Sequence, residues 1–216
     1  MNLTQDVNFP LYVRRQDLTK FLVRYELFKM AMHVHGSIIE CGVLGGAGVM
    51  AWYHLSSIFE PYNHTRRIVG FDTFEGFPHV SDNDRTEEVQ HHIGEMASDS
   101  YDQILGVVQE HDANRPIGHI PKVELVKGDA LDTIPKYQSN NPHLIVALLY
   151  CDFDLYEPTD TALRYFLHLM PKGAIVAFDE AGNKNWPGET QALLPYLGDL
   201  KLQRMPWQST VSYAVI

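Results

Sequence analysis

Residues 37–48, with the sequence SIIECGVLGGAG, constrain the fold more than any other stretch of this chain. The apolar pair Ile38 and Ile39 is typical of a buried strand, and Glu40 and Cys41 come at the end of that strand. Four glycines follow within seven residues, and the next ten residues, VMAWYHLSSI, have a helical pattern. A strand, a glycine-rich turn and a helix form the opening unit of a nucleotide-binding α/β domain.

The spacing in the glycine-rich turn indicates which nucleotide it suits. Glycine leaves the backbone open to a ligand and accepts the positive φ of a tight turn. The pattern E-x-G-x-x-x-G, which runs from Glu40 through Gly42 to Gly46, differs from the G-x-G-x-x-G of dinucleotide sites. A carboxylate at the strand end can receive an ammonium group but repels a pyrophosphate, so S-adenosylmethionine fits better than NAD. The alternative is a glycine-rich turn without a ligand.

Composition fits a single domain spanning residues 1–216, because 45% of the residues are hydrophobic and 20% are charged. The formal net charge of −10 argues against a nucleic-acid partner, which needs a basic face, and disfavours anionic membranes. No apolar run reaches the roughly 18 residues of a membrane span, and the N-terminus lacks a signal-peptide pattern. We therefore expect Cys41 and Cys151 to be buried, reduced thiols of a cytoplasmic protein.

The N-terminal segment, residues 1–36, is predicted to contain one amphipathic helix. Apolar residues recur at helical spacing from Asp17 onward, and Gly36 ends the pattern. Two arginines, Arg14 and Arg15, precede this helix and fit a solvated surface, with a clamp over a ligand site as the alternative. This segment is our candidate surface for homo-oligomer formation.

The second and third predicted strands carry residues suited to an adenosine. The strand Ile68–Phe71 ends at Asp72, where a carboxylate can accept hydrogen bonds from both ribose hydroxyls. The following residues, TFEGFP, provide Phe74 for stacking and then a turn. The strand Val123–Val126 leads to Asp129, whose side chain can accept a hydrogen bond from an adenine amino group.

The remaining strands complete the predicted sheet. HLIVALLYC is the most apolar run, predicts a central strand and ends at Asp152, while GAIVAF predicts a fifth strand that ends at Asp179 and Glu180. LKLQRM and TVSYAVI predict two antiparallel strands joined by a short turn. The result is an α/β fold of the Rossmann-like class I methyltransferase type: seven strands, mostly parallel, with helices on both faces and an antiparallel last strand.

Residues 80–100 differ in character from the segments around them, because they are polar and only weakly periodic. We predict a mobile lid with a short helical piece over the ligand site. It contains adjacent histidines, His91 and His92, which would point about 100° apart on a helix and rarely chelate a metal together. We expect these histidines to be exposed or to contact the substrate. A helix, Tyr101–Asp112, is predicted to follow.

Five segments, in this order, resemble the macrocin O-methyltransferase family: ECGVLGG, GFDTFEGFP, KGDALDTIP, DFDLYEPT and AFDE. The resemblance runs from about Ser37 to Glu180 and more loosely to the C-terminus. GFDTFEGFP and DFDLYE are its specific motifs, whereas the glycine turn alone is not specific. Members of this family methylate sugar hydroxyls in natural-product biosynthesis, using S-adenosylmethionine and Mg²⁺.

The resemblance implies a cofactor site and a metal site. The cofactor site corresponds to Glu40, Gly42, Asp72 and Asp129, and we extend it to the neighbouring Cys41, Gly45, Thr73, Phe74 and Ala130. The metal ligands correspond to Asp152, Asp179 and Glu180. The chain departs from the family at two places: Glu180 stands where a second aspartate is usual, and Ala47-Gly48 stand where a serine or threonine is common.

The residues also fit metal-assisted chemistry. Mg²⁺ prefers hard oxygen ligands, and a divalent ion makes a weakly nucleophilic hydroxyl easier to deprotonate. Three carboxylates at neighbouring strand ends leave positions for two substrate oxygens, which predicts a vicinal diol such as a sugar as the acceptor. Asp154, beside Asp152, is the candidate general base. The alternatives are a helix cap or salt bridge for Asp154, and a lid histidine as the base.

Two other functions remain open from the sequence. The acceptor can be a catechol-like or other small molecule instead of a sugar. A nucleoside-binding scaffold without catalysis is the third possibility, although simple ligand binding does not require three carboxylates.

Overall fold

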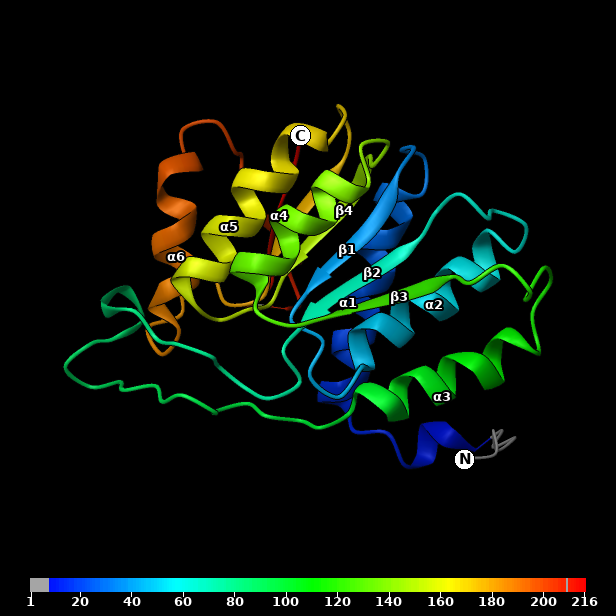
Figure 1. Cartoon of the computed structure of the whole chain (residues 1–216), viewed down its shortest axis with the longest axis horizontal. Coiled ribbons are helices and arrows are strands. Elements are labelled where there is room, and N and C mark those ends of the chain that lie inside the picture. Colours follow the sequence, from blue (N-terminus) through cyan, green and yellow to red (C-terminus); the bar gives the residue numbers. More distant parts are fainter. Residues whose placement is uncertain (1–7, 209) are drawn as a thin grey trace.

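The computed structural model describes residues 8–208 and 210–216, so residues 1–7 of the predicted N-terminal segment and Ser209 in the C-terminal turn lie outside the described residues. The strands form one seven-stranded sheet in the order β3-β2-β1-β4-β5-β7-β6 (Figure 1). Their bounds are β1 Ser37–Cys41, β2 Ile68–Asp72, β3 Val123–Lys127, β4 Val146–Cys151, β5 Ile175–Phe178, β6 Gln203–Arg204 and β7 Ser212–Val215.

The pairing of the strands confirms the predicted fold class. The strands β1 to β5 pair in parallel, whereas β7 runs antiparallel to β5 and to β6. All five residues of β1 and all six of β4 are buried, as expected for central strands covered on both faces. Parallel strands bring their carboxyl ends to one edge of the sheet, and the predicted site residues follow those ends.

Helices cover both faces of the sheet. Their bounds are α1 Arg15–Ala31, α2 Ala47–Phe59, α3 Tyr101–Asp112, α4 Ala130–Asn140, α5 Tyr156–Phe166 and α6 Pro187–Leu193, with short 3-10 turns at Phe9–Leu11, Asp82–Asp84, Leu167–Leu169 and Leu194–Tyr196. Figure 1 shows α4, α5 and α6 together on one side of the strands and α2 and α3 on the other.

The alternation of strand side chains builds two cores. Ile38 of β1 packs with α1, α2 and α3 through residues such as Leu27 and Trp52, while the adjacent Ile39 packs on the other face with α4 and α5. Cys41 of β1 and Cys151 of β4 are neighbours in the strand register. Both are buried, and neither forms a disulfide, as predicted. In the described part of the chain, no helix is long and apolar enough to cross a membrane.

Residues 80–100 contain less regular structure than predicted. The expected helical piece is only the 3-10 turn Asp82–Asp84, and the rest of the segment is a long loop that extends away from the sheet before α3 (Figure 1).

Candidate active site

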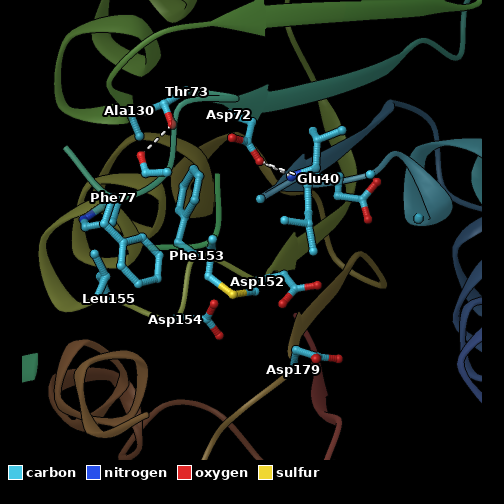
Figure 2. Close-up of a pocket in the computed structure, with 18 of the residues that line it drawn as sticks. Glu40, Asp72, Thr73, Phe77, Ala130, Asp152, Phe153, Asp154, Leu155 and Asp179 are labelled. Carbon is cyan, nitrogen blue, oxygen red and sulfur yellow. Dashed lines mark hydrogen bonds between the residues drawn. The ribbon is translucent and has the colours of Figure 1, made fainter. Parts of the chain in front are cut away.

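A cavity of about 550 Å³ lies at the carboxyl ends of the parallel strands, and Figure 2 shows part of its lining. It combines residues from the ends of β1 to β5, from α1 and from the loop before α6. Most predicted site residues line it, namely Glu40, Gly42, Gly45, Asp72, Thr73, Asp129, Ala130, Asp152, Asp154, Asp179 and Glu180. The fold therefore brings together carboxylates that are widely separated in the sequence.

The glycine-rich turn folds tightly against the end of β4. Gly42 has φ +94, and a Cβ there would overlap the backbone carbonyl oxygen of Asp152. Asp72 fixes the same turn from β2, because its Oδ2 accepts hydrogen bonds from the N–H groups of Val43 (2.7 Å) and Leu44 (2.8 Å). The glycines of this turn leave its backbone open to a ligand, which fits the predicted nucleoside cofactor.

Helix α1 provides one wall of the cavity. Asp17, Lys20, Phe21 and Arg24 line it at the spacing of a single helix face. Arg14 is exposed and pairs with Asp17 at 2.8 Å, so the arginine at the site is Arg24 instead of the pair considered from the sequence. In the sequence, Arg24 looks like any polar residue of an amphipathic helix. Only its contacts with residues distant in the sequence show that it belongs to the site.

Arg24 and Glu40 form a buried ion pair at the cavity. Nη2 of Arg24 donates to Oε1 of Glu40 at 3.2 Å and lies 3.7 Å from Oδ2 of Asp152. Burial raises the pKa of Glu40 to about 7, although the nearby charge of Arg24 opposes this shift. Oε2 of Glu40 is buried without a hydrogen-bond partner. An unpartnered oxygen here fits the predicted role of Glu40 as acceptor for the cofactor's ammonium group.

Asp129 lines the cavity from the start of α4. Its Oδ1 caps this helix by accepting from the N–H of Leu131 at 2.9 Å. His79 also lines the cavity, with Nδ1 3.4 Å from Oδ2 of Asp129 and Nε2 2.8 Å from Glu157. His79 was not singled out in the sequence, because a lone histidine in a turn carries no pattern.

Four acidic side chains lie where β4 and β5 end, namely Asp152, Asp154, Asp179 and Glu180. Tyr150 donates to Oδ1 of Asp179 at 2.6 Å, and Asn183 donates to Oε2 of Glu180 at 2.5 Å. Burial, followed by the charge of Asp179, raises the pKa of Asp152 well above its ordinary value. Burial and the charges of Glu180 and Asp179 raise the pKa of Asp154 to about 8. Mutual repulsion in this group makes a cation a suitable partner.

These carboxylates have the right donor chemistry for Mg²⁺ but are not arranged as a finished metal site. Among the residues that the structure describes, no three His, Cys, Asp or Glu side chains are placed to hold a metal ion. Asp154 has φ +64 and the N-cap of α5 is Leu155, so the alternative of Asp154 as that helix's cap is wrong. A hard cation would satisfy oxygens that now repel one another.

A further carboxyl, Glu189 of α6, supports this group from behind. It is fully buried, and its Oε1 accepts a hydrogen bond from the N–H of Glu180 at 2.9 Å. Burial raises the pKa of Glu189 well above its ordinary value. Nothing in the sequence distinguishes it from a surface glutamate at the start of a helix.

The lid segment and the loop before α6 are joined by aromatic rings. The rings of His91 and Trp186 stack at 4.0 Å with an interplanar angle of 6°, and Nε2 of His91 lies 2.9 Å from the carbonyl oxygen of Asn185. The expectation that His91 is exposed is wrong, because its ring is buried in this stack, whereas His92 is exposed. Trp186 and Phe77 line the cavity and form an aromatic wall.

Two predicted cofactor residues do not present their side chains to the cavity. Phe74 is buried against Tyr101, with ring centroids 5.2 Å apart, and it does not line the cavity. Phe77, three residues later, lines it instead. The thiol of Cys41 packs into the core on the α4 and α5 face of the sheet. The alternation of side chains along a strand explains the position of Cys41, because Glu40 and Cys41 face opposite sides of the sheet.

The sheet order, the antiparallel β7 and the cavity beside the glycine-rich turn together define a class I S-adenosylmethionine-dependent methyltransferase. The family model described as macrocin O-methyltransferase (TylF) matches residues 21–196, which is most of the chain. The protein belongs to this family and is an S-adenosylmethionine-dependent O-methyltransferase.

Solved structures agree with this assignment. A crystal structure of CalS11, calicheamicin methyltransferase, is 38% identical, covers 96% of this chain and 82% of its own, and has a TM-score of 0.91. An apo structure of CalS11, described as a TDP-rhamnose 3′-O-methyltransferase in calicheamicin biosynthesis, is 35% identical, with coverages of 96% and 83% and a TM-score of 0.82. The O-methyltransferase NovP is 19% identical, covers 91% and 78%, and has a TM-score of 0.65, so it shares the fold. No curated protein sequence matches the chain.

Proposed function

We propose that this enzyme transfers the methyl group of S-adenosylmethionine to a hydroxyl of a sugar or of a glycosylated small molecule, with the help of a divalent metal ion. The observation that carries the proposal is that one cavity joins the glycine-rich turn to four acidic side chains at the ends of β4 and β5. CalS11, whose structure is described as that of a TDP-rhamnose 3′-O-methyltransferase, supports a sugar as the acceptor class.

The cofactor's parts are assigned to residues along the cavity. Asp72 would bind the ribose hydroxyls, although its carboxylate also holds the glycine-rich turn. Asp129 and Ala130, at the start of α4, would border the adenine. Glu40 would accept the ammonium group through its unpartnered Oε2. This assignment is supported by the sheet order, because Asp129, Asp72 and Glu40 lie at the carboxyl ends of the neighbouring strands β3, β2 and β1.

The metal is assigned to Asp152, Asp179 and Glu180. When bound, S-adenosylmethionine supplies an electrophilic methyl group, and Mg²⁺ supplies positive charge that favours loss of a proton from a hydroxyl. Asp179 can serve through Oδ2, since Tyr150 occupies Oδ1. Glu180 is held in place by Asn183 at its side chain and by Glu189 at its backbone N–H.

Asp154 would accept the proton of the acceptor hydroxyl. Its side chain is almost buried and lines the cavity, and its backbone lies in the left-handed region with φ +64. The aromatic wall of Phe77 and Trp186 would hold the acceptor against these carboxylates and limit access of water. Lys20 of α1 places a compensating cation near Asp154 and Glu180.

The test is a methyl-transfer screen read by mass shift. Nucleotide-sugars, glycosylated metabolites and catechols are incubated with S-adenosylmethionine, with Mg²⁺ or with excess chelator. We expect methylated sugars only in the presence of metal. Methylation of catechols alone would support the non-sugar alternative, and binding of S-adenosylhomocysteine without transfer to any acceptor would support the scaffold.

A further inference from the structure

We propose that Asp84, at the start of the lid, is a positioning residue for methyl transfer: it fixes the first turn of α5 and thereby the loop that carries Asp154. The inference rests on the proposed function, in which Asp154 accepts the proton of the acceptor hydroxyl. Asp84 is not among the residues that line the cavity, so it acts through the backbone of this loop instead of touching a ligand.

The carboxylate of Asp84 is buried and hydrogen-bonded through both oxygens. The residue is 1% exposed, although it lies in a polar loop segment. Its Oδ2 accepts from the N–H (2.8 Å) and the hydroxyl (2.6 Å) of Ser81, and its Oδ1 accepts from the N–H of Tyr156 at 2.6 Å. A buried carboxylate is costly unless such donors satisfy it. The side chain therefore ties the start of the lid to a residue 72 positions away.

Tyr156 is the first residue of α5, and the helix provides no acceptor for its N–H. The first N–H groups of a helix lack partners within it and carry the positive end of the helix dipole. Leu155, at the N-cap, offers them no side-chain hydrogen bond. Asp84 thus supplies from the lid both the acceptor and the negative charge that a polar N-cap residue provides in other helices.

The loop between β4 and α5 is held at its two ends. At one end, the N–H of Asp152 donates to the carbonyl oxygen of Cys41 in β1 at 2.7 Å. At the other end, Tyr156 is held by Asp84. Asp154 lies between these points with φ +64, a backbone conformation that a residue with a side chain adopts only where the surrounding structure imposes it. Loss of the bond at Tyr156 should release Asp154 from this conformation and move its carboxyl in the cavity.

The start of α6 closes this junction. A Cβ at Gly188 would overlap Oδ1 of Asp84 and lie 2.5 Å from the backbone nitrogen of Tyr156, so glycine lets α6 pack against this hydrogen bond. The next residue, Glu189, accepts from the N–H of Glu180 after β5. Asp84 therefore reaches the loop after β4 directly and the loop after β5 only through α6. We expect its removal to disturb the proton-accepting side chain more than the acidic residues after β5.

The test measures kcat and the KM for the acceptor separately, at saturating S-adenosylmethionine, with TDP-rhamnose or with a sugar acceptor that the screen above ranks higher. The variants are Asp84→Ala, which removes the acceptor of the Tyr156 N–H, and Asp84→Asn, which retains an oxygen there. Asp82→Ala is the matched control, because Asp82 lies in the same 3-10 turn with a fully exposed side chain. Trp186→Ala loosens the lid at the His91 stack and leaves the bond at Tyr156 intact. Calorimetry with S-adenosylhomocysteine reports on the cofactor site independently of activity.

We expect Asp84→Ala to lower kcat about 10-fold or more, since a misplacement of about 1 Å can cost this much. The KM and the S-adenosylhomocysteine affinity should stay near their wild-type values. Asp84→Asn should recover part of kcat, Asp82→Ala should match the wild type, and Trp186→Ala should raise the KM instead. Unchanged kcat in Asp84→Ala would overturn the proposal. So would a rise in the KM alone, as in Trp186→Ala, because Asp84 would then only anchor the lid.

A second variant decides the matter if Asp84→Ala does not fold. Reduced kcat in Asp84→Asn at wild-type S-adenosylhomocysteine affinity supports the proposal, and wild-type kcat overturns it. An equal loss of kcat and of cofactor affinity, with a lower melting temperature, would also overturn it, because that pattern reflects a general loss of the fold. A wild type that methylates no acceptor would overturn the proposed function itself, a result distinct from an active wild type with an equally active Asp84→Ala.

Discussion

The hydroxyl of Tyr150 donates a 2.6 Å hydrogen bond to Oδ1 of Asp179, between the neighbouring strands β4 and β5. Tyr150 is fully buried, so no bulk water can replace this bond. The guanidinium of Arg24 lies over the same phenol ring, 4.6 Å from its centroid. One face of the central strand thus orients an acidic residue of the proposed metal site, while the second oxygen of that residue is left for a ligand.

The first prediction concerns metal dependence. Asp152→Asn and Asp179→Asn should lose most methyl-transfer activity while keeping the fold, because each replaces a carboxylate of the proposed metal site with a neutral amide. Mg²⁺ should raise the melting temperature of the wild type, since a bound ion stabilises the folded state. Glu180→Gln should keep more turnover than the two aspartate variants, because the longer side chain is already held by Asn183.

The control for this experiment is Asp160→Asn, which removes a carboxylate from an ion pair with Arg164 on α5. It should retain activity and the Mg²⁺-dependent rise in melting temperature. Full turnover of the wild type in excess chelator, together with unimpaired Asp152→Asn and Asp179→Asn, would contradict the metal mechanism.

The second prediction concerns Asp72. Asp72→Ala should weaken S-adenosylhomocysteine binding by about 1–3 kcal/mol, the range for lost hydrogen bonds to a charged group. Part of this loss would come from the glycine-rich turn, since Val43 and Leu44 lose their shared acceptor. Calorimetry measures the effect, and a folded variant with wild-type affinity would exclude the assignment. Asp82→Ala, which changes an exposed carboxylate, is the control.

The elements of the sheet were predictable because their signals are local. Apolar runs such as that of β4 mark buried strands, and a carboxylate after each run marks the carboxyl edge of the sheet. The contributions of Arg24, His91 and Glu189 were not predictable in this way. Each is a polar residue whose burial depends on residues that are distant in the sequence.

The choice between two aromatic residues shows the same limit. Phe74 and Phe77 occur in one short motif, and the sequence alone does not say which faces the ligand. The chain places Phe74 at φ +59, where its ring packs on Tyr101 of α3, and Phe77 at the cavity. We predicted Phe74 from the motif, but the geometry of the turn places Phe77 at the cavity instead.

The third prediction concerns Gly48. Gly48→Ala should destabilise the protein and weaken S-adenosylhomocysteine binding, because the new methyl group would overlap Oε1 of Glu40. Gly106→Ala in α3 is the matched control, since a Cβ there meets nothing within 4 Å. That change should stabilise the helix by about 0.5–1 kcal/mol. Thermal and urea unfolding measure both variants, and equal stability of the two would refute the steric argument.

The fourth prediction concerns pH and Lys122. This side chain is buried and donates to the carbonyl oxygen of Asn63 at 2.6 Å. Burial lowers its pKa from the ordinary 10.5 to about 8. Between these two values the unfolded chain binds the proton and the folded chain does not, so stability should rise with pH.

Lys122→Met provides the comparison for this effect. The free energy of unfolding of the wild type, measured relative to this variant by urea denaturation, should increase from pH 8 to pH 10.5 and level off above it. A difference that is constant or decreases over this range would show that Lys122 remains charged in the folded protein.

The last prediction concerns the lid, residues 80–100. Its attachments to the body include a hydrogen bond of 2.6 Å from the N–H of Tyr156 to Oδ1 of Asp84, a hydrogen bond from the hydroxyl of Ser98 to the carbonyl oxygen of Leu44, and the stack of His91 on Trp186. Hydrogen exchange should be fast in residues 80–100 of the free protein, except at hydrogen-bonded amides such as those of Gly94 and Asp99, and slower once acceptor binds. Trp186→Ala removes one attachment and part of the aromatic wall, so the KM for the acceptor should rise about 3-fold or more, while S-adenosylhomocysteine binding stays unchanged. Trp207→Ala, at an exposed tryptophan outside the cavity, should alter neither value. Strong protection of the whole lid without any ligand would contradict its mobility, and an equal loss of cofactor affinity in Trp186→Ala would contradict its assignment to the acceptor side.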